Sequence, residues 1–132
     1  MELDLVQQLG ANEEPFGQRL TLYIPNKDRN GNVLPDHEKW TKEAQELLTE
    51  IGDGATSFPP VDGTWRKPDG TDLWEQTKMI YAYIDPDKLA ANKGRLRSFL
   101  HRFGCKTNQG KVVFEFGGLF WGIEKYDMTQ EK

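Results

Sequence analysis

The chain has 132 residues, of which 36% are hydrophobic, 11% aromatic and 29% charged, and its net charge is −4 at pH 7. This length suits one globular domain, and the aromatic content argues against disorder. A single cysteine, Cys105, excludes an internal disulfide, and no apolar run approaches the roughly 20 residues of a membrane span. Residues 1–6 lack a signal-peptide pattern. We therefore expect one soluble, cytoplasmic domain over residues 1–132.

The first half of the chain predicts a strand and a helix after an N-terminal segment. Residues 1–17 form either a loose arm or a short helix that Gly10 ends. Alternating apolar side chains over Leu20–Ile24 predict the strand. Asp36 is expected to cap the helix, and Gly52 to end it. The apolar side chains at helical spacing between them are Trp40, Ala44, Leu47, Leu48 and Ile51.

The middle of the chain predicts a β-hairpin that turns at residues 69–70, an Asp-Gly pair. Such pairs favour the positive φ angles of a two-residue loop. In that register Trp65 lies opposite Trp74, and Arg66 reaches Glu75 diagonally across the two strands. The second strand of the hairpin then continues to about residue 84.

The second half predicts another helix and another strand. Asp85 and the proline after it open the helix, Gly94 weakens its middle, and Gly104 ends it. Residues 112–116 form the last strand, which two glycines break or bulge before residues 119–123. The order strand-helix-strand-strand-helix-strand is typical of the α+β, ferredoxin-like fold. That split βαβ arrangement has a four-stranded antiparallel sheet with two helices on one face.

Residues 58–85, FPPVDGTWRKPDGTDLWEQTKMIYAYID, carry a resemblance to known proteins. They resemble an uncharacterised bacterial family of small proteins with a Gly-x-Trp-Arg hairpin signature, in which a glycine turn and a glutamate follow. The matching residues are Gly63, Trp65, Arg66, Gly70 and Glu75. The family has no established activity, so the resemblance implies no function.

Two residue pairs of the hairpin are candidates for a ligand site. Arg66 and Glu75 could bind and convert an anionic substrate, with the carboxylate as acid or base. The alternative, which we favour, is a cross-strand ion pair that sets the hairpin register. Trp65 and Trp74 could line a site for a planar ligand, although a stacked pair at the sheet end is the simpler interpretation.

Met79, Tyr81 and Tyr83 share one face of the strand that follows the hairpin. An uncovered aromatic face would be a sticky patch on a monomer. We expect a second copy to cover it in a homodimer, and the alternative is a ligand cleft that uses the two tyrosines.

The positive charge of the chain is concentrated in one segment. Residues 86–112 contain seven basic side chains and one acidic side chain. Those of the predicted helix over 86–106 could contact nucleic-acid phosphates. They are Lys93, Arg95, Arg97, Arg102 and Lys106. Because they spread around more than one helix face, we favour a solvated helix or a contact with an acidic partner.

No motif indicates a metal or a cofactor. His37 and His101 fall in different predicted helices, and neither has a partner at metal-ligand spacing. The sequence has no phosphate-binding loop, dinucleotide fingerprint or nucleophile elbow. We therefore expect a small homodimeric binding domain with no assignable catalytic activity. The alternatives are a small enzyme that uses Arg66, Glu75 and a tyrosine in a sheet cleft, or nucleic-acid or phosphate binding through residues 86–106.

Overall fold

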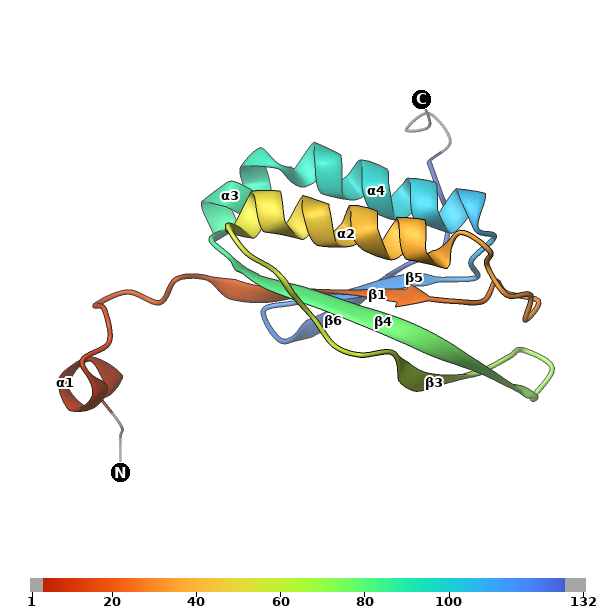
Figure 1. The fold of residues 1–132 in the computed structure, drawn as a ribbon, viewed down its shortest axis with the longest axis horizontal. Helices are drawn as coiled ribbons and strands as arrows, with labels where there is room; N and C mark the ends of the chain where they lie inside the picture. The colour runs from red at the N-terminus through yellow and green to blue at the C-terminus, as the bar shows by residue number, and fades with distance from the viewer. Residues whose placement is uncertain (1–3, 128–132) are drawn as a thin grey trace.

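A computed structural model describes residues 4–127 of the chain, and Figure 1 shows their arrangement. Helices and strands follow one another in the order α1, β1, α2, β2, β3, β4, α3, α4, β5 and β6. Their bounds are α1 Leu5–Leu9, β1 Gln18–Pro25, α2 His37–Gly52, β2 Thr56–Ser57, β3 Val61–Arg66, β4 Asp72–Ile84, α3 Pro86–Ala91, α4 Lys93–Lys106, β5 Val112–Phe116 and β6 Leu119–Ile123. No helix among the described residues is long and apolar enough to span a membrane.

The strands form one antiparallel sheet in the order β2-β4-β1-β5-β6, with β3 paired to β4. The α+β class is therefore confirmed, but the sheet has six strands instead of the predicted four. One added strand comes from Gly117 and Gly118, which both have positive φ angles. They make a turn that pairs Phe116 with Leu119, so β5 and β6 form a hairpin where we expected a break or bulge.

Helices α2 and α4 cover one face of the sheet, and the hydrophobic core lies between them and the strands (Figure 1). Leu20, Leu22 and Ile24 alternate along β1 and are fully buried on this face. Trp40 of α2 packs edge-on against Phe103 of α4, with ring centroids 5.3 Å apart. This face therefore matches the apolar pattern read from the sequence.

Two helix ends differ from the expected ones because other segments pack closely against glycines. Helix α2 runs through Gly52, and Asp53 takes the left-handed conformation instead. A Cβ on Gly52 would lie only 3.0 Å from the Cβ of Ala82, so this glycine allows α2 to approach β4. Helix α4 continues past Gly104, where the ring of Tyr126 occupies the space that a side chain would need.

The hairpin register is shifted from the predicted one. Trp65 pairs with Leu73, and Thr64 pairs with Trp74, so the two tryptophans do not face each other. The cause is the turn, in which Asp69 accepts hydrogen bonds from both the backbone N–H and the hydroxyl of Thr71. Its loop spans residues 67–71 instead of two residues, and a one-residue slip changes which side chains share a face.

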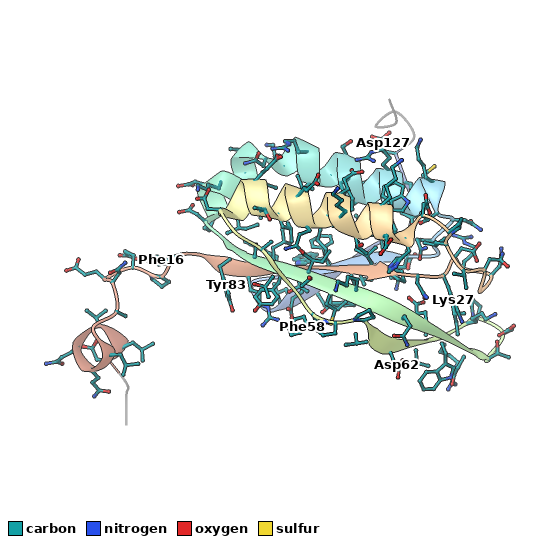
Figure 2. All side chains as sticks on the ribbon, in the orientation of Figure 1. Phe16, Lys27, Phe58, Asp62, Tyr83 and Asp127 are labelled. Carbon is teal, nitrogen blue, oxygen red and sulfur yellow. The ribbon has the colours of Figure 1, made fainter. Side chains whose placement is uncertain are left out.

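No helix of the described residues covers the other face of the sheet, and we call it the open face. Its side chains on β1 and β4 are Arg19, Thr21, Tyr23, Glu75, Thr77, Met79, Tyr81 and Tyr83. Figure 2 shows Phe58 and Tyr83 on this side, opposite the helices. The candidate site must be sought here, because the helix-covered face is filled by the core.

Residues 4–17 form an arm that extends beyond the end of the sheet (Figure 1). Its helix α1 begins after Asp4, whose carboxylate accepts the N–H of Gln7, and ends at the left-handed Gly10. None of the residues of α1 is buried. The sequence predicted either a short helix or a loose arm here, and the segment contains a short helix within an arm that extends beyond the end of the sheet.

Candidate functional site

Glu75 is the centre of the candidate site. Its position in β4 directs it to the open face, yet only 6% of its surface is exposed. Its cross-strand neighbour is Gly63 of β3. A Cβ on Gly63 would lie 3.0 Å from Thr77 Oγ1 and 3.6 Å from Glu75 Cγ, so the glycine leaves room above the carboxylate. Gly63 and Glu75, which both belong to the hairpin signature, therefore lie next to each other across the two strands.

Burial raises the pKa of the Glu75 carboxyl from its usual 4.5 to about 7. A weak hydrogen bond from Thr77 Oγ1, 3.4 Å from Oε2, and the charge of Lys27 oppose this rise. The Lys27 Nζ donates its own hydrogen bond to the carbonyl of Trp74, at 2.8 Å. A carboxyl with a pKa near 7 exchanges a proton readily at neutral pH, and such shifts are typical of functional sites.

A hollow of about 230 Å³ on the open face contains Glu75. Aromatic rings and a thioether form much of its wall. These side chains are Tyr23, Trp65, Met79 and Phe120. The rings of Tyr23 and Phe120 meet edge to face with centroids 5.8 Å apart, which joins β1 to the added strand β6. Aromatic faces attract cations, so this hollow combines a buried carboxylate with walls that favour a positively charged ligand.

A second hollow of about 490 Å³ adjoins the first, because Pro25, Trp65 and Glu75 line both. Its other walls are more polar and include Arg29, Lys67 and Lys111. The two volumes together fall in the range of small-molecule sites, about 300–1,000 Å³. Glu75 and Trp65 thus stand at the junction of an apolar part and a basic part.

The structure breaks the predicted pairs of the hairpin site, although Arg66 lines the second hollow together with Trp65 and Glu75. Arg66 forms an ion pair with Asp72, its cross-strand neighbour, and not with Glu75. The predicted Arg66–Glu75 pair is wrong because of the shifted register. Trp74 is mostly exposed and is absent from the lining of the hollow around Glu75. Trp65 and Glu75 remain together.

Several lining residues were given no site role by the sequence analysis, among them Tyr23, Gly63, Thr77 and Phe120. Alternation along the first and third predicted strands would have placed Tyr23 and Thr77 on the same face as Glu75. Gly63 was noted as part of the signature without a role. Phe120 could not be found, since its position depends on the β5–β6 hairpin.

The predicted tyrosine pair lies away from Glu75, at the other end of the open face. Tyr81 packs on Phe58 and Tyr83, with centroids 5.4 and 5.9 Å away. The guanidinium of Arg19 lies 4.3 Å from the centre of the Tyr81 ring. The alternative in which Arg66, Glu75 and a tyrosine share one cleft therefore fails for Tyr81 and Tyr83; the tyrosine beside Glu75 is Tyr23.

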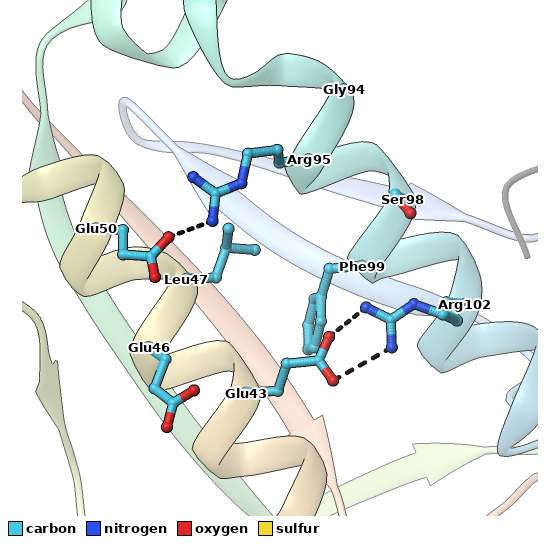
Figure 3. Close-up of a pocket in the computed structure, with 9 residues that line it drawn as sticks. All are labelled: Glu43, Glu46, Leu47, Glu50, Gly94, Arg95, Ser98, Phe99 and Arg102. Carbon is cyan, nitrogen blue, oxygen red and sulfur yellow. Dashed lines mark hydrogen bonds and ion pairs between the residues drawn. The ribbon is translucent and has the colours of Figure 1, made fainter. Parts of the chain in front are cut away.

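The basic helix does not present a free cationic surface. A groove of about 440 Å³ lies between α2 and α4. In it Arg95 pairs with Glu50, and Arg102 pairs with Glu43 (Figure 3). Arg97 forms an ion pair with Asp127 at 3.5 Å. Three of the five cations proposed for nucleic-acid binding are thus matched by carboxylates of the chain itself, which leaves less free positive charge for that alternative. Lys93 and Lys106 are exposed.

Within residues 4–127, no three His, Cys, Asp or Glu side chains are grouped to hold a metal ion. The Nε2 of His37 donates a hydrogen bond to the Ile24 carbonyl oxygen, at 2.8 Å. His101 accepts the backbone N–H of Asp127 on its Nδ1, at 2.7 Å. Burial and the nearby charge of Arg97 lower the pKa of His101. Both histidines therefore join segments of the fold and lie outside the site around Glu75.

No protein family model matches this sequence, and no curated protein matches it. Two solved structures share its fold. A phage SAM lyase in complex with S-methyl-5'-thioadenosine matches with a TM-score of 0.56 and 10% identity, over 87% of this chain and 97% of that chain. A phage SAM lyase in its apo state matches with a TM-score of 0.56 and 14% identity, over 87% and 95%.

These likenesses show a common fold. They contradict the expectation of a binding domain without catalytic activity, because the solved structures with this fold are those of an enzyme. The description of the protein as a binding domain without catalytic activity is therefore corrected.

Proposed function

We propose that this chain is a small enzyme that cleaves S-adenosylmethionine, or a closely related sulfonium compound, at Glu75. The observation that carries the proposal is the buried Glu75 carboxylate in a hollow walled by Tyr23, Trp65 and Phe120. An ionised carboxylate and aromatic faces both stabilise a positive charge that has left water. The shared fold with a SAM lyase, at 10–14% identity, supports the choice of this substrate class.

The chemistry requires little from the protein besides orientation and charge. Formation of S-methyl-5'-thioadenosine breaks the bond between the sulfur and the aminobutyrate chain, and the electron pair stays on sulfur. The leaving group is then a neutral thioether and needs no acid. On the carbon side, either the substrate's own carboxylate closes a lactone, or a base removes a neighbouring proton. In this proposal Glu75, with its pKa near 7, holds the cation and serves as that base.

The test is to incubate the purified protein with S-adenosylmethionine and to measure thioadenosine formation by liquid chromatography and mass spectrometry. We expect product with the wild type and a loss of at least about 100-fold in Glu75→Gln, the size typical of acid–base residues. Glu115→Gln is the matched control, since Glu115 is a partly buried carboxylate on β5 that does not line the hollow. Equal activity in wild type and Glu75→Gln, or no turnover at all, would contradict the proposal.

The identity of the second product assigns the role of Glu75; the two candidate products are isomers of equal mass, so NMR against authentic standards distinguishes them. A homoserine lactone means that the substrate's carboxylate forms the new bond and that Glu75 only holds charge. 2-Aminobut-3-enoate means that a proton was removed, and Glu75 is then the base.

We infer in addition that the protein associates with a second copy through the open face. Tyr83 is 54% exposed there, and no helix among the described elements covers this side. Aromatic area of this kind favours burial in an interface. Sedimentation should show a dimer at micromolar concentration, and Tyr83→Glu should dissociate it. A wild-type monomer at high concentration would contradict the association.

A further inference from the structure

The arm is a segment without a binding surface of its own. Leu9 is 75% exposed, Phe16 is 79% exposed, and none of the residues of α1 is buried. A five-residue helix is at best marginally stable alone in water even when both ends are capped, since isolated helices shorter than about 12 residues are marginal. Helix α1 is therefore expected to need a surface to pack on, and none of its residues is buried against its own chain.

The geometry at Gly17 directs the arm away from that body. Its φ is +152°, and a Cβ there would lie 2.6 Å from the carbonyl carbon of Ile84, so only glycine fits this close passage. From this point the chain continues past the end of the sheet (Figures 1 and 2), and Figure 2 shows Phe16 on the arm outside the body.

On the open face, the guanidinium of Arg19 lacks a hydrogen-bonding partner among the described residues. Its Nε atom is buried without a hydrogen-bond partner, and no carboxylate of residues 4–127 lies within 4 Å of the guanidinium. The guanidinium is held in place on the ring of Tyr81, 4.3 Å from its centre. Buried polar groups are normally hydrogen-bonded, and a fixed, unpaired guanidinium is suited to a carboxylate.

The arm carries the matching groups. Its charged side chains are Asp4, Glu13 and Glu14, and it contains no lysine or arginine. Neither Glu13 nor Glu14 forms an ion pair or hydrogen bond with the rest of the described chain. Beside Tyr81 and Tyr83 lies a hollow of about 710 Å³, which Phe16 of the same chain also lines, and it offers room for an apolar side chain such as Leu9.

We propose that the arm of one copy docks on the open face of a second copy, where Glu13 or Glu14 pairs with Arg19 and α1 packs against Tyr81 and Tyr83. The proposal rests on the self-association inferred above and assigns its contacts. The contact is reciprocal, because each copy supplies one arm and one face, and a closed two-fold dimer results. Opposite charges fix the register of the arm, and the apolar side chains supply the buried area.

A charge exchange between two variants tests the docking. Arg19→Glu and the double variant Glu13→Lys/Glu14→Lys each place like charges in contact when they self-associate. We expect both to dimerise at least about tenfold more weakly than the wild type, the size of a modest coupling between charges. In an equimolar mixture every arm meets a face of opposite charge, so we expect a heterodimer of near wild-type affinity. Sedimentation with one copy carrying a fluorescent label measures it.

Controls separate folding, association and catalysis. Glu46→Lys makes the chain more positive, as the arm variant does, but at an exposed position of α2 outside the docking contact. It should leave the dimer intact. Circular dichroism checks that each variant is folded. A wild-type dimer that neither charge variant weakens, or a mixture that forms no heterodimer, overturns the arm docking while self-association stands. A wild-type monomer overturns both. Thioadenosine formation is measured in parallel, so loss of the proposed function is seen separately.

Discussion

The helix-covered face and the open face of the sheet are built by alternate residues of the same strands, yet they follow different rules. On the covered face Leu20, Leu22 and Ile24 are fully buried and apolar. On the open face Arg19 and Thr21 each have a buried polar atom without a partner in the described chain. Apolar packing stabilises the first face. The second keeps unpaired polar groups that cost stability, which is typical of surfaces that bind something.

The largest expected difference between the faces concerns side-chain truncation. Leu22→Ala should lower the free energy of unfolding by about 3 kcal/mol, because it leaves a cavity among fully buried side chains. Tyr23→Ala, one residue away on the open face, should cost less than half as much, since its ring is only half-buried. Urea unfolding measures both variants. An equal loss at Tyr23 would mean that the open face is part of the structural core.

A second difference appears with pH. Because the pKa of Glu75 is raised from 4.5 to about 7, ionisation disfavours the folded state. Below pH 4.5 the Glu75 carboxyl is protonated in both states, so the folded state carries no penalty. As the pH rises from there to about 7, the carboxyl ionises only in the unfolded state, and the folded state loses stability. Glu75→Gln should therefore be more stable than wild type at pH 8, by at most about 3 kcal/mol from the shift, and equal to it at pH 4. Thermal unfolding at both values checks this, and a destabilised Glu75→Gln at pH 8 would contradict it.

The smallest expected effect concerns the unpaired hydroxyl. Thr21 is fully buried, and its Oγ1 has no partner, so Thr21→Val should raise the free energy of unfolding by about 1 kcal/mol. Thr77→Val is the matched variant. Its hydroxyl donates to Glu75, so the same change there should not stabilise and should raise the pKa of Glu75 further. Loss of stability in Thr21→Val would show that the hydroxyl has a partner, such as a bound water.

The site was only partly predictable, for a reason visible at the hairpin. The signature pointed to Trp65 and Glu75, which do meet at the junction of the two hollows. The partner assigned to Glu75 was wrong, because Asp69 binds Thr71 and lengthens the loop beyond two residues. In a strand pair, a slip of one residue changes every cross-strand neighbour, and turn chemistry at this level is not readable from residue types alone.

The sequence by itself determined the α+β class, the apolar stripe of α2 and the alternating residues of β1, because these depend on local periodicity. Only the tertiary structure decided that β5 continues into β6, which brings Phe120 to Tyr23, and that Arg95 and Arg102 are neutralised by Glu50 and Glu43 of α2. It also decided that Glu75 is buried. Burial and ion pairing depend on which segments meet across the fold, and the raised pKa that makes Glu75 a candidate catalytic group follows from that burial.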